Sequence, residues 1–149
     1  MPPHRHFRRP APTAAARGVA ALAIIALATS VAAQIVPTGS PAADILLTRA
    51  LADQRVFLTC SSLDPKTHAQ ALAAWQRDVT DAVAILAANA TPAEAISAFE
   101  AAARPQTLLP AADTPFAEVR QLCENNPDWH TAYQQNATPL PLQLQQALK

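Results

Sequence analysis

Glycine is almost missing from this chain, and its absence restricts the fold more than any other feature of the sequence. Two glycines occur among 149 residues, and neither lies beyond Gly39. Phosphate-binding loops and nucleophile elbows require glycine, because the backbone there approaches a ligand closely or takes a positive φ. For residues 40–149 the sequence therefore excludes mononucleotide and dinucleotide folds and the α/β-hydrolase class.

The first 33 residues are typical of an export signal. Residues 1–17 contain four arginines and no acidic residue, residues 18–33 are largely apolar, and the stretch ends in small residues. This order predicts a secretory signal peptide that is cleaved after Ala32 or Ala33, leaving about 116 residues in the periplasm. The apolar stretch is shorter than the ~20 residues of a typical membrane-spanning helix, so a retained membrane anchor is the less favoured alternative.

The residues after position 33 carry an excess of negative charge. All eleven acidic residues lie there, against seven lysines and arginines, so this part has a formal charge of −4. It contains no run of basic residues. Because nucleic acids and anionic membranes are bound by clustered positive charge, we expect neither as the main partner.

Cys60 and Cys123 are the only cysteines of the chain. In an exported protein, such a pair predicts a disulfide bond. The pair lacks the C-x-x-C spacing that is typical of redox catalysis, which favours a structural role. In the chain-entropy model, closing a loop of this length stabilises the fold by about 4 kcal/mol.

The segment 34–42 is rich in Pro, Gly and Ser and predicts a linker, which a helical domain at 43–136 then follows. Strand-forming residues are sparse, so the expected fold is all-α. We expect four main helices and a short fifth, with the disulfide joining the first helix to the fourth. Residues 137–149 are rich in Pro, Leu and Gln and predict an extended or frayed tail, which can end in one helical turn.

Proline and capping residues mark where the helices begin. Asp64 is expected to cap the second helix, with Pro65 in its first turn. The tetrapeptide N-A-T-P occurs at 89–92 and 136–139, where Thr91 and Thr138 are expected to cap helices that begin at the following proline. Glu94 would complete a capping box with Thr91.

Two of the expected helices have a clear apolar stripe. The stripe of the second helix consists of Leu72, Trp75, Val79, Val83 and Leu86. In the fourth helix, at about 115–125, Phe116, Val119 and Cys123 share a stripe that is expected to face the core.

Four residues are candidates for a binding surface: Leu108, Leu109, Trp129 and Tyr133. Leu108 and Leu109 lie in an expected loop at 105–114 without a helix to bury them. They are either an exposed contact or, as the favoured alternative, a lid folded back on the core. Trp129 and Tyr133 lie on the short fifth helix, and aromatic residues are enriched at interfaces, although Trp129 is equally suited to anchoring a core.

Three residues are candidates for metal ligands: His68, Asp128 and His130. Asp128 and His130 are two residues apart, so on a helix their side chains diverge. Catalytic zinc normally takes three protein ligands, and the favoured reading of His68 is a partly buried core residue, with a titrating switch steadied by Asp64 as the alternative. We expect no metal and no cofactor.

The sequence thus predicts an exported helical protein that binds a protein or envelope component and has no catalytic activity. Three alternatives remain. The small, acidic, helical architecture with one disulfide is similar to that of bacterial acid-stress chaperones, whose carboxylates discharge at low pH. The bundle could also carry an apolar ligand, or hold a metal for catalysis.

Overall fold

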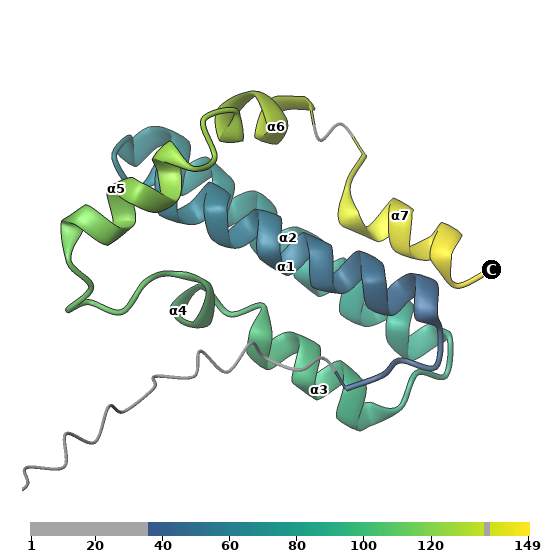
Figure 1. Cartoon of the computed structure of the whole chain (residues 1–149). Coiled ribbons are helices and arrows are strands. Elements are labelled where there is room, and N and C mark those ends of the chain that lie inside the picture. The colour runs from purple at the N-terminus through teal and green to yellow at the C-terminus, as the bar shows by residue number, and fades with distance from the viewer. Residues whose placement is uncertain (1–35, 136–137) are drawn as a thin grey trace, which may run out of the picture. The chain divides into compact units, whose positions relative to one another are not determined.

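The computed structural model describes residues 36–135 and 138–149, which belong to one compact unit. The predicted signal peptide, its cleavage position and the alternative of a membrane anchor lie outside the described residues. The described part of the chain contains seven helices and no strand (Figure 1), which confirms the all-α class. The helices are α1 (Pro41–Ser61), α2 (Pro65–Ala88), α3 (Ala93–Ala102), α4 (Pro105–Leu108), α5 (Phe116–Glu124), α6 (Trp129–Gln135) and α7 (Leu140–Ala147).

The two longest helices, α1 and α2, form the centre of the fold (Figure 1), and every other helix packs against at least one of them. Their contact buries Leu47 and Leu58 of α1 and Trp75 of α2. The indole Nε1 of Trp75 donates a hydrogen bond of 2.8 Å to the carbonyl of Ala103 at the end of α3. Phe99 of α3 is fully buried as well, so α3 closes one side of the core.

The segment predicted as a linker is held firmly at the start of α1. Ser40 caps the helix by accepting a hydrogen bond of 3.3 Å from the Ala43 N–H. Thr38 is buried, and its backbone N–H and its hydroxyl donate to Oδ1 of Asp44 at 2.8 and 2.7 Å. The Ser40 hydroxyl also donates to the carbonyl of Ala147 at 3.0 Å, which joins the start of α1 to the end of α7.

Helix α2 matches its prediction closely. Asp64 caps it by accepting from the Lys66 N–H at 3.2 Å, and Pro65 occupies the first turn. On the predicted stripe Trp75 and Leu86 are buried, and Leu72, Val79 and Val83 are half-buried against the core.

The predicted capping box at the start of α3 is wrong. Helix α3 begins after Pro92 without a side-chain cap, because Thr91 belongs to the end of α2 instead. The N–H groups of Ala90 and Thr91 donate to the carbonyls of Ala87 and Leu86 at 3.3 and 3.2 Å. These two bonds form a Schellman motif in which Ala90, at φ +54°, takes the position that glycine usually occupies. Helix α7 likewise follows Pro139 without a cap from Thr138, so both N-A-T-P repeats precede helices but neither threonine caps one.

The predicted extended tail is a helix that belongs to the core. In α7, Leu140 and Leu144 are buried, and α7 packs against both α1 and α2. The spacing of four residues places these leucines on one helical stripe, and Ala147 and Leu148 extend it. The alternation of leucine with proline and glutamine conceals this period in the sequence.

The predicted disulfide is present between Cys60 of α1 and Cys123 of α5, with their Cα atoms 5.6 Å apart. The expectation that the stripe of α5 faces the core is wrong, since no residue of this helix is buried and Phe116 is 65% exposed. Val119 and Cys123 are half-buried, because α5 packs on the end of α1 to which the disulfide ties it. Among the described helices, none combines the length and apolarity needed to cross a membrane.

Candidate functional site

The four residues predicted as a binding surface have different environments. Leu108, at the end of the single turn α4, is 5% exposed and belongs to the core, and Leu109 is half-buried against it. This segment therefore folds back on the core, which is the alternative that the sequence favoured. Leu108 is not accessible to a partner.

Trp129 and Tyr133 lie one turn apart on α6, and both are half-buried. Helix α6 lies on α1, where the ring of Tyr133 meets the ring of Phe57 edge-on at a centroid distance of 5.3 Å. Trp129 makes a similar edge contact of 5.4 Å with His130. The two predicted aromatic residues thus frame hollows on the surface of α1.

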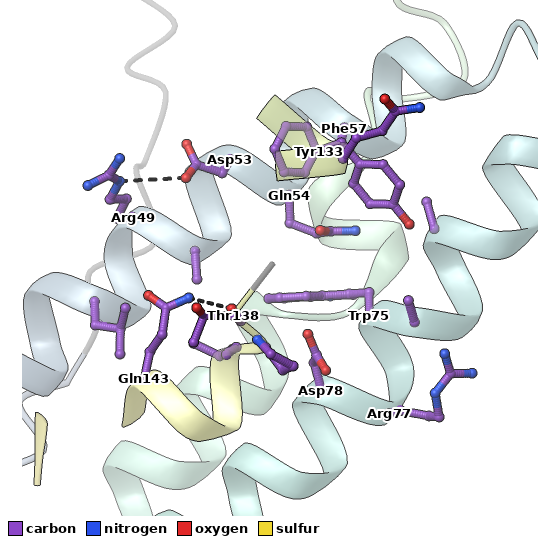
Figure 2. Close-up of a pocket in the computed structure, with 17 residues that line it drawn as sticks. Arg49, Asp53, Gln54, Phe57, Trp75, Arg77, Asp78, Tyr133, Thr138 and Gln143 are labelled. Atoms are coloured by element: carbon purple, nitrogen blue, oxygen red, sulfur yellow. Dashed lines mark hydrogen bonds and ion pairs between the residues drawn. The ribbon is translucent and has the colours of Figure 1, made fainter. Parts of the chain in front are cut away.

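One of these hollows, which we call the α1 cavity, has a volume of about 740 Å³ and lies between α1, α2, α6 and the start of α7 (Figure 2). Phe57, Trp75 and Tyr133 contribute aromatic walls, while Gln54, Asp78 and Gln143 contribute polar groups. A volume of this size is typical of small-molecule sites, which combine apolar walls with a few polar groups.

Gln54 is the most unusual residue of the α1 cavity. Its side chain is 7% exposed, yet its Nε2 donor has no hydrogen-bond partner among the described residues. Burying such a donor unpaired costs about 1–3 kcal/mol, so buried amides are nearly always satisfied. Gln54 therefore carries an unused donor in a side chain that lines the cavity.

Asp78 supplies a carboxylate to the same space, and Figure 2 shows Asp78 and Gln54 on opposite sides of the Trp75 ring. Burial raises the pKa of Asp78 above its usual value, and the negative charge of Asp81 adds to this effect. The backbone N–H of Leu140 at the start of α7 and the charge of Arg77 both lower the pKa of Asp78, but burial dominates.

The rim of the α1 cavity carries charges that are already paired or exposed. Arg49 and Asp53 form an ion pair of 3.7 Å on the surface of α1. The same two residues border a second hollow of about 420 Å³ beneath Trp129, so the surface of α1 is hollowed on both sides of α6. Arg77 also lines the cavity, at an exposed position.

A separate hollow, which we call the α5 hollow, lies beside the disulfide. It has a volume of about 220 Å³ and is lined by Thr59, Leu63, Phe116, Val119 and Cys123, with the ion pair of Arg120 and Glu124 at its edge. Leu63 and Phe116 are 72% and 65% exposed. At its base the hydroxyl of Thr59 is buried without a hydrogen-bond partner among the described residues.

The residues predicted as metal ligands are not arranged as a metal site. In the part of the chain that the structure describes, no three His, Cys, Asp or Glu side chains cluster. His68 is half-buried, and its Nδ1 lies 3.0 Å from the hydroxyl of Ser61. In the alternative reading of His68 the carboxylate of Asp64 would steady it, but this carboxylate accepts from the Thr67 hydroxyl and the Lys66 N–H, which lowers the pKa of Asp64. His130 and Asp128 are exposed on the surface.

The contact between Ser61 and His68 does not form a catalytic dyad. Ser61 is 1% exposed, and its hydroxyl donates to the carbonyl of Leu58 at 3.3 Å. A buried serine at the end of α1 cannot reach a substrate. The pair closes the junction of α1 and α2, in keeping with the favoured reading of His68 as a core residue.

The sequence analysis did not identify Gln54 and Asp78 as candidate site residues, although their positions in the sequence indicate both. Gln54 lies on the stripe of Leu47, Leu51 and Leu58, and Asp78 follows Trp75 by three residues on the buried side of α2. A polar residue at a core position is a sign of a buried polar site. No protein-family model, no curated protein and no solved structure matches this chain, so its function is inferred from the site itself.

Proposed function

We propose that this chain is an exported helical binding protein without catalytic activity, and that the α1 cavity is its binding site. The observation that carries this proposal is the Gln54 side chain, which lines the cavity and whose buried Nε2 donor has no partner among the described residues. A ligand that accepts a hydrogen bond from Gln54 would remove the cost of leaving this donor unpaired.

The composition of the α1 cavity supports binding rather than catalysis. The described residues that line it include no histidine, serine or cysteine, the residue types that most often act as base or nucleophile. Its polar groups are amides, a phenol, the hydroxyl of Thr138 and charged side chains around three aromatic rings. These groups orient and select a ligand without reacting with it.

The disulfide supports the exported location. Disulfides persist in oxidising compartments such as the periplasm and are rare in the cytosol. The Cys60–Cys123 bond therefore agrees with the signal peptide that residues 1–33 predict.

Native mass spectrometry of the full chain tests the proposal, with the protein recovered from a bacterial periplasm without reductant. We expect a processed, oxidised species that retains a small molecule in stoichiometric amount, and we expect Gln54→Leu to lose it. Gln70→Leu, on the exposed face of α2, is the matched control and should keep it. A bare wild-type protein that also binds nothing in a screen of small molecules would contradict the proposal.

The α5 hollow favours a second candidate function, the binding of a protein partner. Helix α5 is amphipathic but buries none of its residues, which leaves Phe116 and Leu63 exposed side by side along one hollow. A photo-crosslinking residue at position 116 tests this function, with position 45 as the control because Ile45 is exposed elsewhere. A discrete crosslinked species from position 116 alone supports it, and equal or absent crosslinking at both positions argues against it.

A further inference from the structure

The walls of the α1 cavity concentrate aromatic side chains. Phe57, Trp75 and Tyr133 are three of the seven aromatic residues in the chain, and they come from three different helices. Aromatic rings carry negative charge on their faces, which attracts organic cations, and several rings around one space are the usual means of binding quaternary ammonium groups.

The carboxylate of Asp78 adds a full negative charge without a matching cation. The ion pairs found in the described part of the chain are Arg49 with Asp53 and Arg120 with Glu124, so Asp78 takes part in neither. Asp78 is half-buried, and this burial raises its pKa by removing part of the water around its charged form. A cation that enters the cavity would replace the lost solvation.

The basic residues of the cavity do not favour an anionic ligand. Arg49 is paired with Asp53, and Arg77 is exposed at the rim. An anion in the cavity would lie near Asp78 with no buried cation to compensate for it. A bare metal ion is also a poor fit, because Ca²⁺ and Mg²⁺ require about six oxygen ligands and no acidic cluster occurs among the described residues.

Gln54 defines a second requirement on the ligand. Its unpartnered Nε2 is a hydrogen-bond donor, so the ligand must present an acceptor on the side of Trp75 away from Asp78. We infer that the α1 cavity binds a small organic ammonium compound that also carries a hydroxyl or carbonyl oxygen, with its ammonium group at Asp78 and the Trp75 ring and its oxygen on the other side of Trp75, toward Gln54. This inference rests on the proposed function, since it names the ligand of the same cavity.

Titration calorimetry of the oxidised, processed protein tests the inference. The probes are choline and acetylcholine, each compared with the neutral analogue in which carbon replaces the quaternary nitrogen. We expect at least one ammonium compound to bind at least tenfold more tightly than its neutral analogue. This comparison uses the wild-type protein and does not depend on how well a variant folds.

Two variants test the roles of the polar residues. Asp78→Asn should reduce the preference for the charged probe at least tenfold, whereas Asp113→Asn, at an exposed position outside the cavity, should leave it unchanged. Gln54→Leu should lower the binding affinity for the charged probe and for its neutral analogue by the same factor. Urea unfolding of each variant checks that it folds.

The outcomes separate the inference from the proposed function. Equal binding of the charged probes and their analogues, or a native adduct that is neutral or anionic, overturns the ammonium assignment but leaves a binding protein. Absence of binding by every probe, together with a bare protein in the mass spectrum, overturns both.

Discussion

The ring of Tyr133 meets the ring of Phe57 edge-on, with the ring planes inclined by 70°. Phe57 is buried on α1, whereas α6, which carries Tyr133, contains no buried residue. An edge-to-face pair of this kind contributes about 0.5–1.5 kcal/mol beyond the burial of its area. The pair therefore fastens α6 to α1 and forms one wall of the α1 cavity.

Replacing Tyr133 with alanine should release α6 without unfolding the core. We expect a loss of about 1–2 kcal/mol in the free energy of unfolding, and a clear rise in amide hydrogen exchange at residues 129–135. Hydrogen exchange with mass spectrometry measures the local effect. Gln134→Ala, at an exposed position of the same helix, should leave exchange unchanged. Equal exchange in wild type and Tyr133→Ala would show that α6 is held by other contacts.

The C-terminal helix should be essential to stability. Leu144 is fully buried, so Leu144→Ala leaves a cavity and should cost about 2–5 kcal/mol. Leu142 lies on the same helix but is 51% exposed, and Leu142→Ala should change stability by about 0.5 kcal/mol or less. Urea denaturation of the two variants measures the difference. Similar midpoints for both would mean that α7 does not pack as described.

Reduction of the disulfide should loosen α5 before the rest of the fold. The bond closes a loop of 63 residues, which corresponds to about 4 kcal/mol in the chain-entropy model. Because α5 buries no residue, it should lose protection first when the bond is absent. We expect reductant to lower the urea midpoint of the wild type and not that of a Cys60→Ser/Cys123→Ser double variant. An unchanged wild-type midpoint would contradict this.

Local features of the sequence were sufficient for α2 and for the disulfide. Asp64 and Pro65 define the start of α2 by backbone chemistry alone, and a chain with two cysteines allows one intramolecular pairing. The same reasoning failed at Thr91, because a threonine that can begin one helix can equally end the previous one. Which role it takes depends on the positive φ of Ala90, and alanine rarely adopts that conformation.

Features that depend on contacts between distant segments could not be predicted. The stripe of α5 is apolar, but nothing in its own residues shows that Phe116 remains exposed. The burial of α7 depends on α1 and α2, which lie far away in the sequence. In the same way, Gln54 and Asp78 stand at core positions of their helices, but only the arrangement of the helices brings them to one cavity.

The strained position at the end of α2 should be improved by glycine. Ala90 adopts φ +54°, which costs a residue with a Cβ atom roughly 1–2 kcal/mol. Ala90→Gly should therefore raise the free energy of unfolding by about 0.5–1 kcal/mol, after the greater entropy of the unfolded glycine chain is included. The same substitution at Ala84, exposed in the middle of α2, should lower it by about 1 kcal/mol. Thermal or urea unfolding that gives both changes the same sign would refute the Schellman assignment.

Asp78 should contribute more to the free energy of unfolding in acid than at neutral pH. This is the opposite of the acid destabilisation that an excess of carboxylates suggests. Burial raises the folded-state pKa of Asp78 above 3.8, so its contribution to stability is complete below that value and is lost as the pH rises through the folded pKa. The pKa of Asp64 is lowered mainly by its hydrogen bond with Thr67, so Asp64 stabilises the fold at neutral pH rather than in acid. Its effect cancels when wild type is compared with an Asp78 variant, because both contain Asp64. Asp78→Asn keeps an acceptor for the Leu140 N–H and removes the buried charge, so this variant should be more stable than wild type at pH 7 and lose that advantage near pH 3. Urea unfolding across this range measures the difference, and an advantage that grows in acid would instead favour an acid-triggered opening of the bundle.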